Sequence, residues 1–341
     1  MPYNPKNPSF GPYPGITQSY LDPKYRQADI QQFNLNIQHR FGADIFAEAA
    51  YVGTVAHHLY DSEDLNAAVY GTGATEANAQ SRRPILPQYY GSMPSLTDDT
   101  TSAYNSLQVD VQKRLSHSYS IQVAYTWEKS IDNRSQSLLG SGAQNPNDVK
   151  AERGLSDFNV GQILAINGIW DLPAMKGKGI LTAVAGGWRL TGIVRYNGGT
   201  PQSILSGEDN ALIGYTRANS GQERADIIGN PKLSFSRSRG AQEAQYFNTA
   251  AFLQPNPGQF GTVGRNTIVG PGNLQNDFAF MKKLVTFPRQ MGGFQFRADL
   301  FNLINWTNLG QLNNTLNSSA FGQISSAGSG RIAQFALRYD F

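Results

Sequence analysis

The sequence lacks three features that would each have placed it in a familiar class. It has no cysteine in 341 residues, which excludes a disulfide framework and a thiolate metal site. Its net charge is only +3, so no surface for nucleic acid is expected. No apolar run approaches the roughly 18 residues that a membrane helix requires. The opening residues, Met1 to Pro8, also lack the apolar core of a signal peptide.

The composition is poor in charge and moderate in apolar residues. Charged residues make up 16% and hydrophobic residues 40% of the chain, and Gly and uncharged polar residues fill the difference. A membrane β-barrel with a water-filled lumen has this composition, because only alternate strand residues need to be apolar. Secreted β-helices and lectin-like sandwiches share it, so composition alone leaves several all-β architectures open.

Apolar and polar residues alternate with period two in about nine segments, which is typical of strands with one apolar face. Each segment is close to the 9–11 residues that cross a bilayer when a strand is tilted. The segments are 33–38, 45–52, 107–112, 121–128, 158–171, 188–197, one beginning at Phe278, 294–300 and 331–341. In the last segment, one face carries Ala333, Phe335, Leu337, Tyr339 and Phe341. A terminal strand that ends on an aromatic residue favours a transmembrane barrel over a soluble domain.

Short and long connections alternate between these segments. The short ones lie around Gly42, Ser116–Ser118, Pro173–Gly177 and Pro288–Gly292. The long ones are expected over 54–102, 132–157, 201–272 and 304–330. Outer-membrane barrels have this asymmetry, with short periplasmic turns and long extracellular loops. The sequence therefore predicts an all-β, antiparallel transmembrane barrel.

The same alternation orients the chain. The last connection is long and hence extracellular, which places Phe341 at the periplasmic end. Counting back, residues 1–28 are expected to be an extracellular loop segment that continues from a missing upstream part, and 29–341 to hold the strands. Single-chain bacterial barrels have an even strand number, so nine strands that start outside indicate the C-terminal portion of a larger barrel.

Two sets of side chains are expected to have opposite surroundings in such a barrel. Aromatic residues near strand ends are expected to form an interfacial girdle, although packing between the sheets of a sandwich would also explain them. The girdle candidates are Tyr125, Trp127, Trp170, Trp188 and Tyr196, with Tyr339 in the last strand. Charged residues on the other face are expected to point into the lumen and to pair with one another or with a plug. These are Glu128, Arg189, Arg195, Arg297, Asp299 and Arg338.

No catalytic or metal-binding motif is recognisable, and no cofactor is expected. The histidines, which have no metal-ligand spacing, are expected to be exposed loop residues: His39, His57, His58 and His117. The acidic run 61–64 and the pair Asp98-Asp99 lack the spacing of a calcium loop and are expected to be solvated loops. The glycines of 261–264 and 270–272 are expected in turns rather than in a phosphate cradle.

Several longer motifs resemble a known family. They are 32–38 (QFNLNIQ), 119–132 (YSIQVAYTWEKSID), 153–158 (RGLSDF), 246–252 (YFNTAAF), 264–272 (GRNTIVGPG), 299–308 (DLFNLINWTN) and the terminal strand. In order and spacing they resemble the C-terminal barrel of TonB-dependent outer-membrane receptors, in particular the Oar-like group with a carboxypeptidase-regulatory-like domain. The resemblance covers essentially the whole chain.

That resemblance implies a barrel of about 22 strands with a plugged lumen, set in outer-membrane lipid. It also implies energy supplied by TonB, and a terminal strand read by the barrel-assembly machinery. The chain departs from the family by lacking the signal peptide, the TonB box, the plug and the early strands. The implied function is uptake or surface binding of a ligand, by loops carried on a rigid scaffold.

Two alternatives come from other classes. The first is a secreted, soluble β-rich adhesin or carbohydrate-binding protein. The second is a secreted polysaccharide hydrolase, which would need two convergent carboxylates about 5–10 Å apart. Glu48 and Asp110 are the candidate pair for that chemistry.

Overall fold

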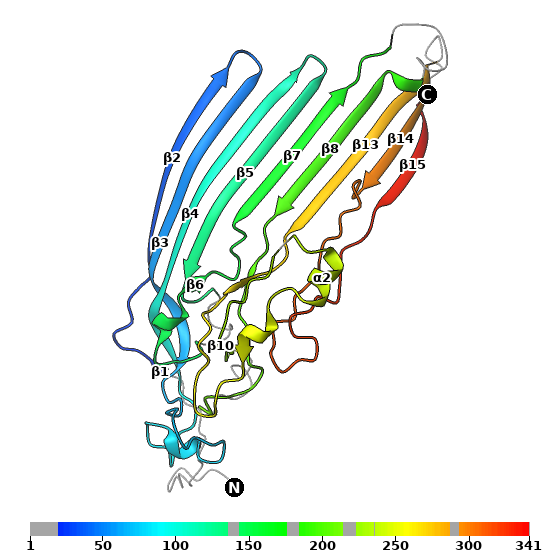
Figure 1. Cartoon of the computed structure of the whole chain (residues 1–341). Coiled ribbons are helices and arrows are strands. Elements are labelled where there is room, and N and C mark those ends of the chain that lie inside the picture. The colour runs from blue at the N-terminus through cyan, green and yellow to red at the C-terminus, as the bar shows by residue number, and fades with distance from the viewer. Residues whose placement is uncertain are drawn as a thin grey trace, which may run out of the picture.

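Nine long strands form one antiparallel sheet in which the strands pair in chain order (Figure 1). The computed structural model describes residues 20–135, 143–175, 184–213, 223–234, 236–286 and 293–340. The prediction of about nine strands in an all-β fold is confirmed, and the sheet is open, with β2 and β15 at its two edges. The strands are β2 (Asp29–Phe41), β3 (Ile45–Asp64), β4 (Pro94–Ser116), β5 (Tyr119–Asp132), β7 (Gln162–Asp171), β8 (Trp188–Asn197), β13 (Asn273–Thr286), β14 (Gly293–Phe301) and β15 (Ile332–Asp340).

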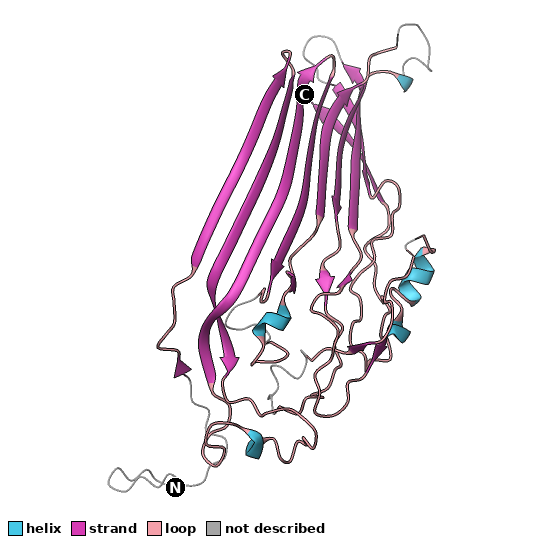
Figure 2. Ribbon diagram, turned by 60° about the vertical axis from the view of Figure 1, so that its left-hand side comes forward, coloured by secondary structure: helices cyan, strands magenta, loops and turns pink. Residues whose placement is uncertain are grey.

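The long connections gather at one end of this sheet, here called the loop end, and carry only short elements (Figure 2). None of the helices among the described residues is both long and apolar enough to cross a membrane. The short elements are β1 (Tyr20–Leu21), η1 (Gln80–Arg82), η2 (Val149–Glu152), β6 (Gly154–Leu155), β9 (Pro201–Gln202), β10 (Asp226–Ile227), α2 (Arg239–Ala244), η3 (Thr249–Ala251), β11 (Phe252–Leu253) and β12 (Ile268–Val269).

Tight turns join strands at the opposite end, here called the turn end. Between β4 and β5 the turn is made by His117 and Ser118, whose φ angles are +51° and +71°. Positive φ at both positions matches the type I′ geometry that follows the twist of a hairpin. Gly42, at φ +61°, begins the turn between β2 and β3. The predicted turn at 288–292 and the end of the one at 173–177 lie outside the described residues.

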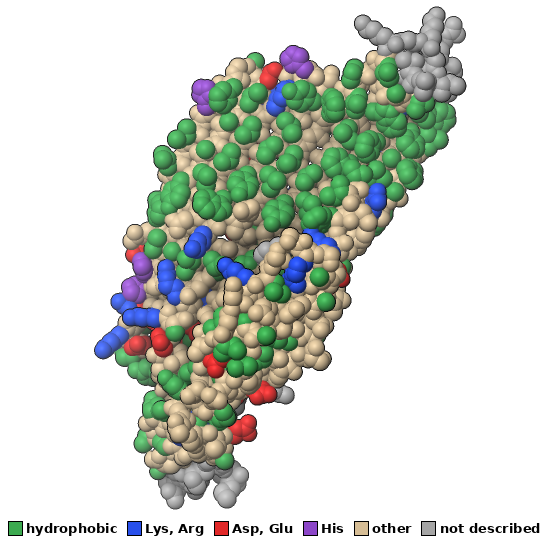
Figure 3. All heavy atoms as spheres, in the orientation of Figure 1, with side chains coloured by type: hydrophobic (Ala, Val, Ile, Leu, Met, Phe, Trp, Pro, Cys, Tyr) green, Lys and Arg blue, Asp and Glu red, His purple; other side chains and the backbone are tan. Residues whose placement is uncertain are grey.

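The two faces of the sheet differ in chemistry, as the period-two pattern predicts. One cross-strand row runs through Leu35, Tyr51, Leu107 and Trp127. A second row contains Leu190, Phe280, Ala298 and Phe335. These rows belong to a broad belt of hydrophobic side chains that covers the sheet between its two ends (Figure 3). Many of the belt residues are solvent-exposed, and Phe335 reaches 70% exposure.

Two strands extend further than the pattern predicts. The expected loop over 54–102 is a connection over 65–93 in the structure, because β3 continues to Asp64 and β4 begins at Pro94. Beyond Ala56 the pairing continues through Leu59↔Thr100 with two register shifts. This part of the hairpin lies past the apolar belt and is flanked by polar loop residues. Its strands therefore have no apolar face, and the alternation that marks a strand is absent.

Segment boundaries elsewhere shift by a few residues. The strand expected over 158–171 begins at Gln162, and β13 begins at Asn273 rather than Phe278. Of the expected loop segment 1–28, residues 1–19 lie outside the described ranges, as does Phe341. Tyr20 and Leu21 pair in parallel with Ser95 and Leu96 of β4.

Candidate functional site at the loop end of the sheet

The two longest connections fold together into one packed unit, here called the loop body (the described parts of 201–272 and 304–330). Its core is a cluster of buried apolar residues that includes Ile204, Phe247, Phe252 and Leu312. The rings of Phe247 and Phe252 meet edge to face at 5.5 Å between centroids. Backbone bridges such as Leu205↔Thr315 join the two connections directly. The loops at this end are therefore a structured unit with its own core.

A buried ion pair attaches the loop body to the connection after β5. Glu152, in η2, accepts hydrogen bonds from Arg224 at 2.6 and 3.0 Å. Both side chains are at most 6% exposed, and the Arg224 Nε atom also donates to the Val263 carbonyl at 2.8 Å. A bidentate, charge-assisted pair of this kind fixes the relative position of the two segments.

A second, partly buried cluster joins three of the recognised motifs. Arg265 forms ion pairs with Asp132 at the end of β5 and with Asp157 (3.0 Å for the latter). The neighbouring Asn266 donates its side-chain amide to Leu155 O at 2.7 Å and to the Asp157 carboxylate at 2.6 Å. Single-residue reasoning missed these residues as a site. The available signal was that all of them lie in the recognised motifs over 119–132, 153–158 and 264–272.

The structure of the acidic run 61–64 differs from the one that the sequence predicts. It was expected to be a solvated loop, but it ends strand β3 and its carboxylates are buried in ion pairs. Arg134 pairs with Asp61 and with Glu63 (2.7 Å for Glu63), and Arg83 pairs with Asp64 at 3.3 Å. Carboxylates at this depth require cationic partners, which the sequence pattern does not reveal.

The other metal candidates also have ordinary surroundings. Asp98 lies in β4 and pairs with Arg26 at 2.9 Å. His39 and His57 are exposed, as expected, but they lie in strands β2 and β3 rather than in loops. An exposed strand face is enough to bring their side chains to the surface. His117 is exposed in its turn, whereas His58 is partly buried near Asp98. Within the described ranges, no group of three or more His, Asp or Glu side chains is placed to hold a metal ion.

The girdle candidates all lie in the apolar rows of the sheet. Trp170 and Trp188 are close to the turn end, whereas Trp127 and Tyr196 are close to the loop end. Tyr125 pairs with Leu164, one position along β5 from the Trp127 row. Trp127 is 60% exposed, and Trp170 and Tyr196 are also exposed. They occupy two levels separated by aliphatic residues, and their contact with a membrane interface stays a prediction.

The charged candidates lie on the opposite, polar face. Arg189 donates to Asp171 at 2.6 and 2.9 Å, and Arg297 donates to Asp299 at 2.9 and 2.8 Å. Glu128 accepts from the Tyr104 hydroxyl at 3.0 Å and from the Val160 amide. The register places Arg195 opposite Ala165 and Gln275, and Arg338 opposite Gln295, on the same face.

The candidate catalytic carboxylates also face this side. Glu48 and Asp110 are direct register partners on β3 and β4. Side-chain amides hold each of them: Asn36 and Gln38 donate to Glu48 (3.1 Å for Gln38), and Gln112 and Gln122 donate to Asp110 at 2.7 and 2.8 Å. Both carboxylates are therefore hydrogen-bonded members of a polar lining.

Comparisons with known proteins identify the family of the chain. A family model described as "Outer membrane beta barrel domain" matches residues 1–334. No curated protein matches the chain. Similar solved structures include the outer membrane transporter YddB from Escherichia coli, with 12% identity and a TM-score of 0.47 over 95% of this chain and 34% of that one.

Two further structures show the same relation. The ferripyoverdine receptor of the outer membrane of Pseudomonas aeruginosa has 11% identity and a TM-score of 0.42, over 92% of this chain and 27% of that one. The FrpB iron transporter from Neisseria meningitidis has 11% identity and a TM-score of 0.42, over 94% and 32%. The chain thus spans about a third of each of these proteins. By the match over residues 1–334, it belongs to the outer membrane beta barrel domain family and is a protein of the bacterial outer membrane.

Proposed function

We propose that this chain is the C-terminal barrel portion of a TonB-dependent outer-membrane receptor of the Oar-like group, and that its loop body contacts the ligand. One observation carries the proposal: nine antiparallel strands place all their long connections at one end, where they pack into a structured unit. Loops held on a rigid strand scaffold are where binding proteins concentrate specificity. The motifs over 119–132, 264–272 and 299–308 support the choice of this receptor group.

The open edges of the sheet support a larger barrel. Strands β2 and β15 each pair on one side only in the described sheet. An exposed strand edge is a site for pairing with another strand, and a membrane barrel must close because lipid cannot satisfy its backbone groups. Upstream strands of the same receptor would supply that closure.

The polar face of the sheet supports a plug inside the lumen. Ile169 and Ile193 lie on this face and are 42% and 44% exposed. Together with Phe301 they border a hollow of about 410 Å³ beside the Arg297–Asp299 pair. Exposed isoleucines are costly against lumen water, because apolar surface is more stable when it is packed. A plug packed against this hollow would cover them.

The terminal strand supports assembly through the barrel-assembly machinery. In β15, Phe335, Leu337 and Tyr339 face outward in register with Ala298, Phe296 and Phe294 of β14. These three residues continue the apolar belt along β15. The resemblance implies that such a strand is the assembly signal.

The alternatives are weaker. Membership of an outer-membrane family is incompatible with a soluble secreted adhesin, and an apolar belt across a whole sheet face would aggregate in water. The hydrolase alternative would rest on Glu48 and Asp110, whose amide partners leave them in a polar lining.

The proposal is tested with an antibody raised against residues 201–272 and separated membrane fractions of the source bacterium. We expect an outer-membrane band larger than a 341-residue chain, and retention of that protein on immobilised periplasmic TonB domain. An unrelated periplasmic domain on the same resin is the control. A soluble band of 341-residue size would contradict the assignment of this chain as part of a membrane barrel. An outer-membrane band that TonB does not retain would contradict the assignment to the TonB-dependent receptors.

A further inference from the structure

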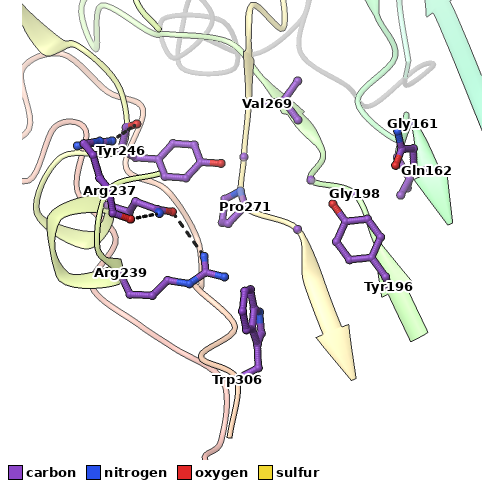
Figure 4. Close-up of a pocket in the computed structure, with 15 residues that line it drawn as sticks. Gly161, Gln162, Tyr196, Gly198, Arg237, Arg239, Tyr246, Val269, Pro271 and Trp306 are labelled. Carbon is purple, nitrogen blue, oxygen red and sulfur yellow. Dashed lines mark hydrogen bonds between the residues drawn. The ribbon is translucent and has the colours of Figure 1, made fainter. Parts of the chain in front are cut away.

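A second cavity borders the loop-body core, between the loop end and the apolar belt. It has a volume of about 680 Å³ and is lined by Tyr196 at the end of β8, Arg239 of α2, Tyr246 and Trp306 (Figure 4). Tyr196 belongs to an apolar row, since it pairs with Leu164 and Leu274. The cavity therefore opens on the apolar side of the sheet, away from the polar face described above.

Two arginines give this cavity a positive charge. The Arg239 guanidinium lies over the Trp306 ring, 4.2 Å from its centroid, and its nearest polar contact is the Gln242 side chain at 3.5 Å. Stacking on an aromatic face leaves the edge N–H groups of a guanidinium free to bind an anion. Arg237 instead donates to backbone carbonyls, including Gln245 O at 2.8 Å. In the described part of the chain, no carboxylate lies within ion-pair distance of either arginine.

The phenol of Tyr246 adds a neutral donor. This side chain is buried, and burial raises the pKa of Tyr246 to about 12, opposed by the nearby Arg239. The hydroxyl therefore stays protonated at neutral pH and can donate a hydrogen bond. Its ring points into the cavity beside Pro271, and Tyr196 faces it from the opposite side (Figure 4).

The back wall of the cavity is rigid because three backbone segments touch. A Cβ atom at Gly198 would fall inside the contact distance of the Val160 carbonyl, and one at Gly199 inside that of the Gly270 carbonyl. Only glycine allows this approach. The glycines of 270–272, which were expected in a turn, lie instead in the extended connection between β12 and β13. The cavity is thus preformed.

A second hollow on the apolar face, here called the trough, lies further along the sheet toward the turn end. Gly168 and Gly192 are direct partners on β7 and β8, and the Phe278 ring packs against Gly192. The trough has a volume of about 550 Å³ and is bordered by Ile166, Val194 and Phe278. Val194 lies one outward position along β8 from Tyr196, so a molecule with a charged head and a long apolar chain can occupy both hollows.

The position of the cavity indicates which part of the membrane surrounds it. A band of Lys and Arg side chains follows the border of the apolar belt on the loop side (Figure 3). In an outer-membrane barrel this border is the level of the outer-leaflet head groups. Aromatic residues and arginines at that level suit the anionic head groups of lipids.

We propose that the cavity binds the phosphate of an outer-leaflet lipid, with Arg239 and the Tyr246 hydroxyl as donors and an acyl chain in the Gly168–Gly192 trough. Phosphate fits because it accepts several hydrogen bonds from one guanidinium edge. The inference rests on the outer-membrane family and does not depend on TonB or on the ligand of the loop body.

The test uses the full receptor that contains this chain, purified in detergent and titrated with bis-phosphorylated lipid A in native mass spectrometry. We expect Arg239→Gln to raise the Kd at least tenfold, the effect of losing one charge-assisted hydrogen bond. Arg239→Lys retains the charge without the planar edge and should have an intermediate effect. Arg331→Gln removes an exposed arginine at the same end of the sheet but outside the cavity, and should leave the Kd unchanged.

Two further probes distinguish the sources of the phosphate. Dephosphorylated lipid A should bind at least tenfold more weakly, and soluble glucosamine 1-phosphate should bind far more weakly than the lipid because it cannot fill the trough. Equal binding by the dephosphorylated lipid, or equal loss in Arg239→Gln and Arg331→Gln, would overturn the phosphate site. Binding of the soluble phosphosugar as tightly as the lipid would overturn the lipid assignment. Heat-modifiable gel mobility checks that each variant is folded.

Discussion

The buried pair of Arg224 and Glu152 makes the structure of the loop body testable. Replacing Arg224 with Met removes two hydrogen bonds to the carboxylate, at 2.6 and 3.0 Å, and leaves a Glu152 side chain that is only 4% exposed. Breaking a buried pair in this way costs about 3–5 kcal/mol, because Glu152 stays buried without its ion-pair partner and keeps the Gln144 amide, at 3.1 Å, as a donor. Since about 1.4 kcal/mol is a factor of ten, local opening should increase by roughly two to four powers of ten.

Hydrogen–deuterium exchange of the detergent-solubilised receptor measures this opening directly. The reporting amides are those of Val263 and Ala225, which donate to Ala225 O and Ile204 O inside the loop body. They should lose protection in Arg224→Met, while amides of the β3–β4 sheet region keep theirs. Replacing both Arg224 and Glu152 with Met should restore much of the protection, because no buried charge is then left alone.

The matched control is the exposed pair of Arg189 and Asp171, whose side chains are 55% and 36% exposed. Arg189→Met should leave local opening almost unchanged, because solvent screens an exposed pair. If Arg224→Met exchanged no faster than wild type, or no faster than Arg189→Met, the account of a packed loop body held by buried ion pairs would be wrong.

Three other perturbations have definite expected outcomes. Leu337→Arg puts a charge into the apolar row of β15 and should cost about 2–4 kcal/mol and lower the outer-membrane level of the receptor, whereas Ala336→Arg on the opposite face should be tolerated. Gly199→Ala should destabilise the wall against Gly270 by about 1–3 kcal/mol in thermal unfolding, while Gly240→Ala, with open space around it, should not. Burial raises the pKa of Glu223 from 4.5 to about 8, so the folded loop body holds a proton there that the unfolded chain releases. The contribution of Glu223 to stability should be full below pH 4.5 and be lost as the pH rises toward 8, and Glu223→Gln should remove that contribution to the pH dependence in proteolysis assays.

The sheet was largely predictable because its physics is local in sequence. Residues such as Leu35 and Phe335 alternate with polar neighbours, since one face meets an apolar environment and the other does not. Strand order followed from connection length. The pattern failed in β3 beyond Ala56, where the hairpin leaves the belt and both faces become polar.

The packing of the loop body was not predicted, since 201–272 and 304–330 were expected only as long loops. Arg224 and Glu152 are 72 positions apart, and no periodicity marks either residue. The burial of Asp61 depends on Arg134, which follows the next hairpin along the chain. Polar residues that fold by pairing with distant partners carry no signature in composition or spacing, so their sites emerge only in three dimensions.

Because the chain has no cysteine, single cysteine substitutions can report which side of the membrane each end of the sheet faces. The substitutions are Glu76→Cys at the loop end, Ala43→Cys at the turn end and Leu35→Cys in the apolar belt, all exposed positions. With a membrane-impermeant maleimide on intact cells, we predict labelling of the first alone. The second should react only after the outer membrane is permeabilised, and the third only with a lipid-soluble maleimide. Labelling of the turn-end and belt positions in intact cells, or of none of the three, would contradict an outer-membrane barrel with its loop body at the cell surface.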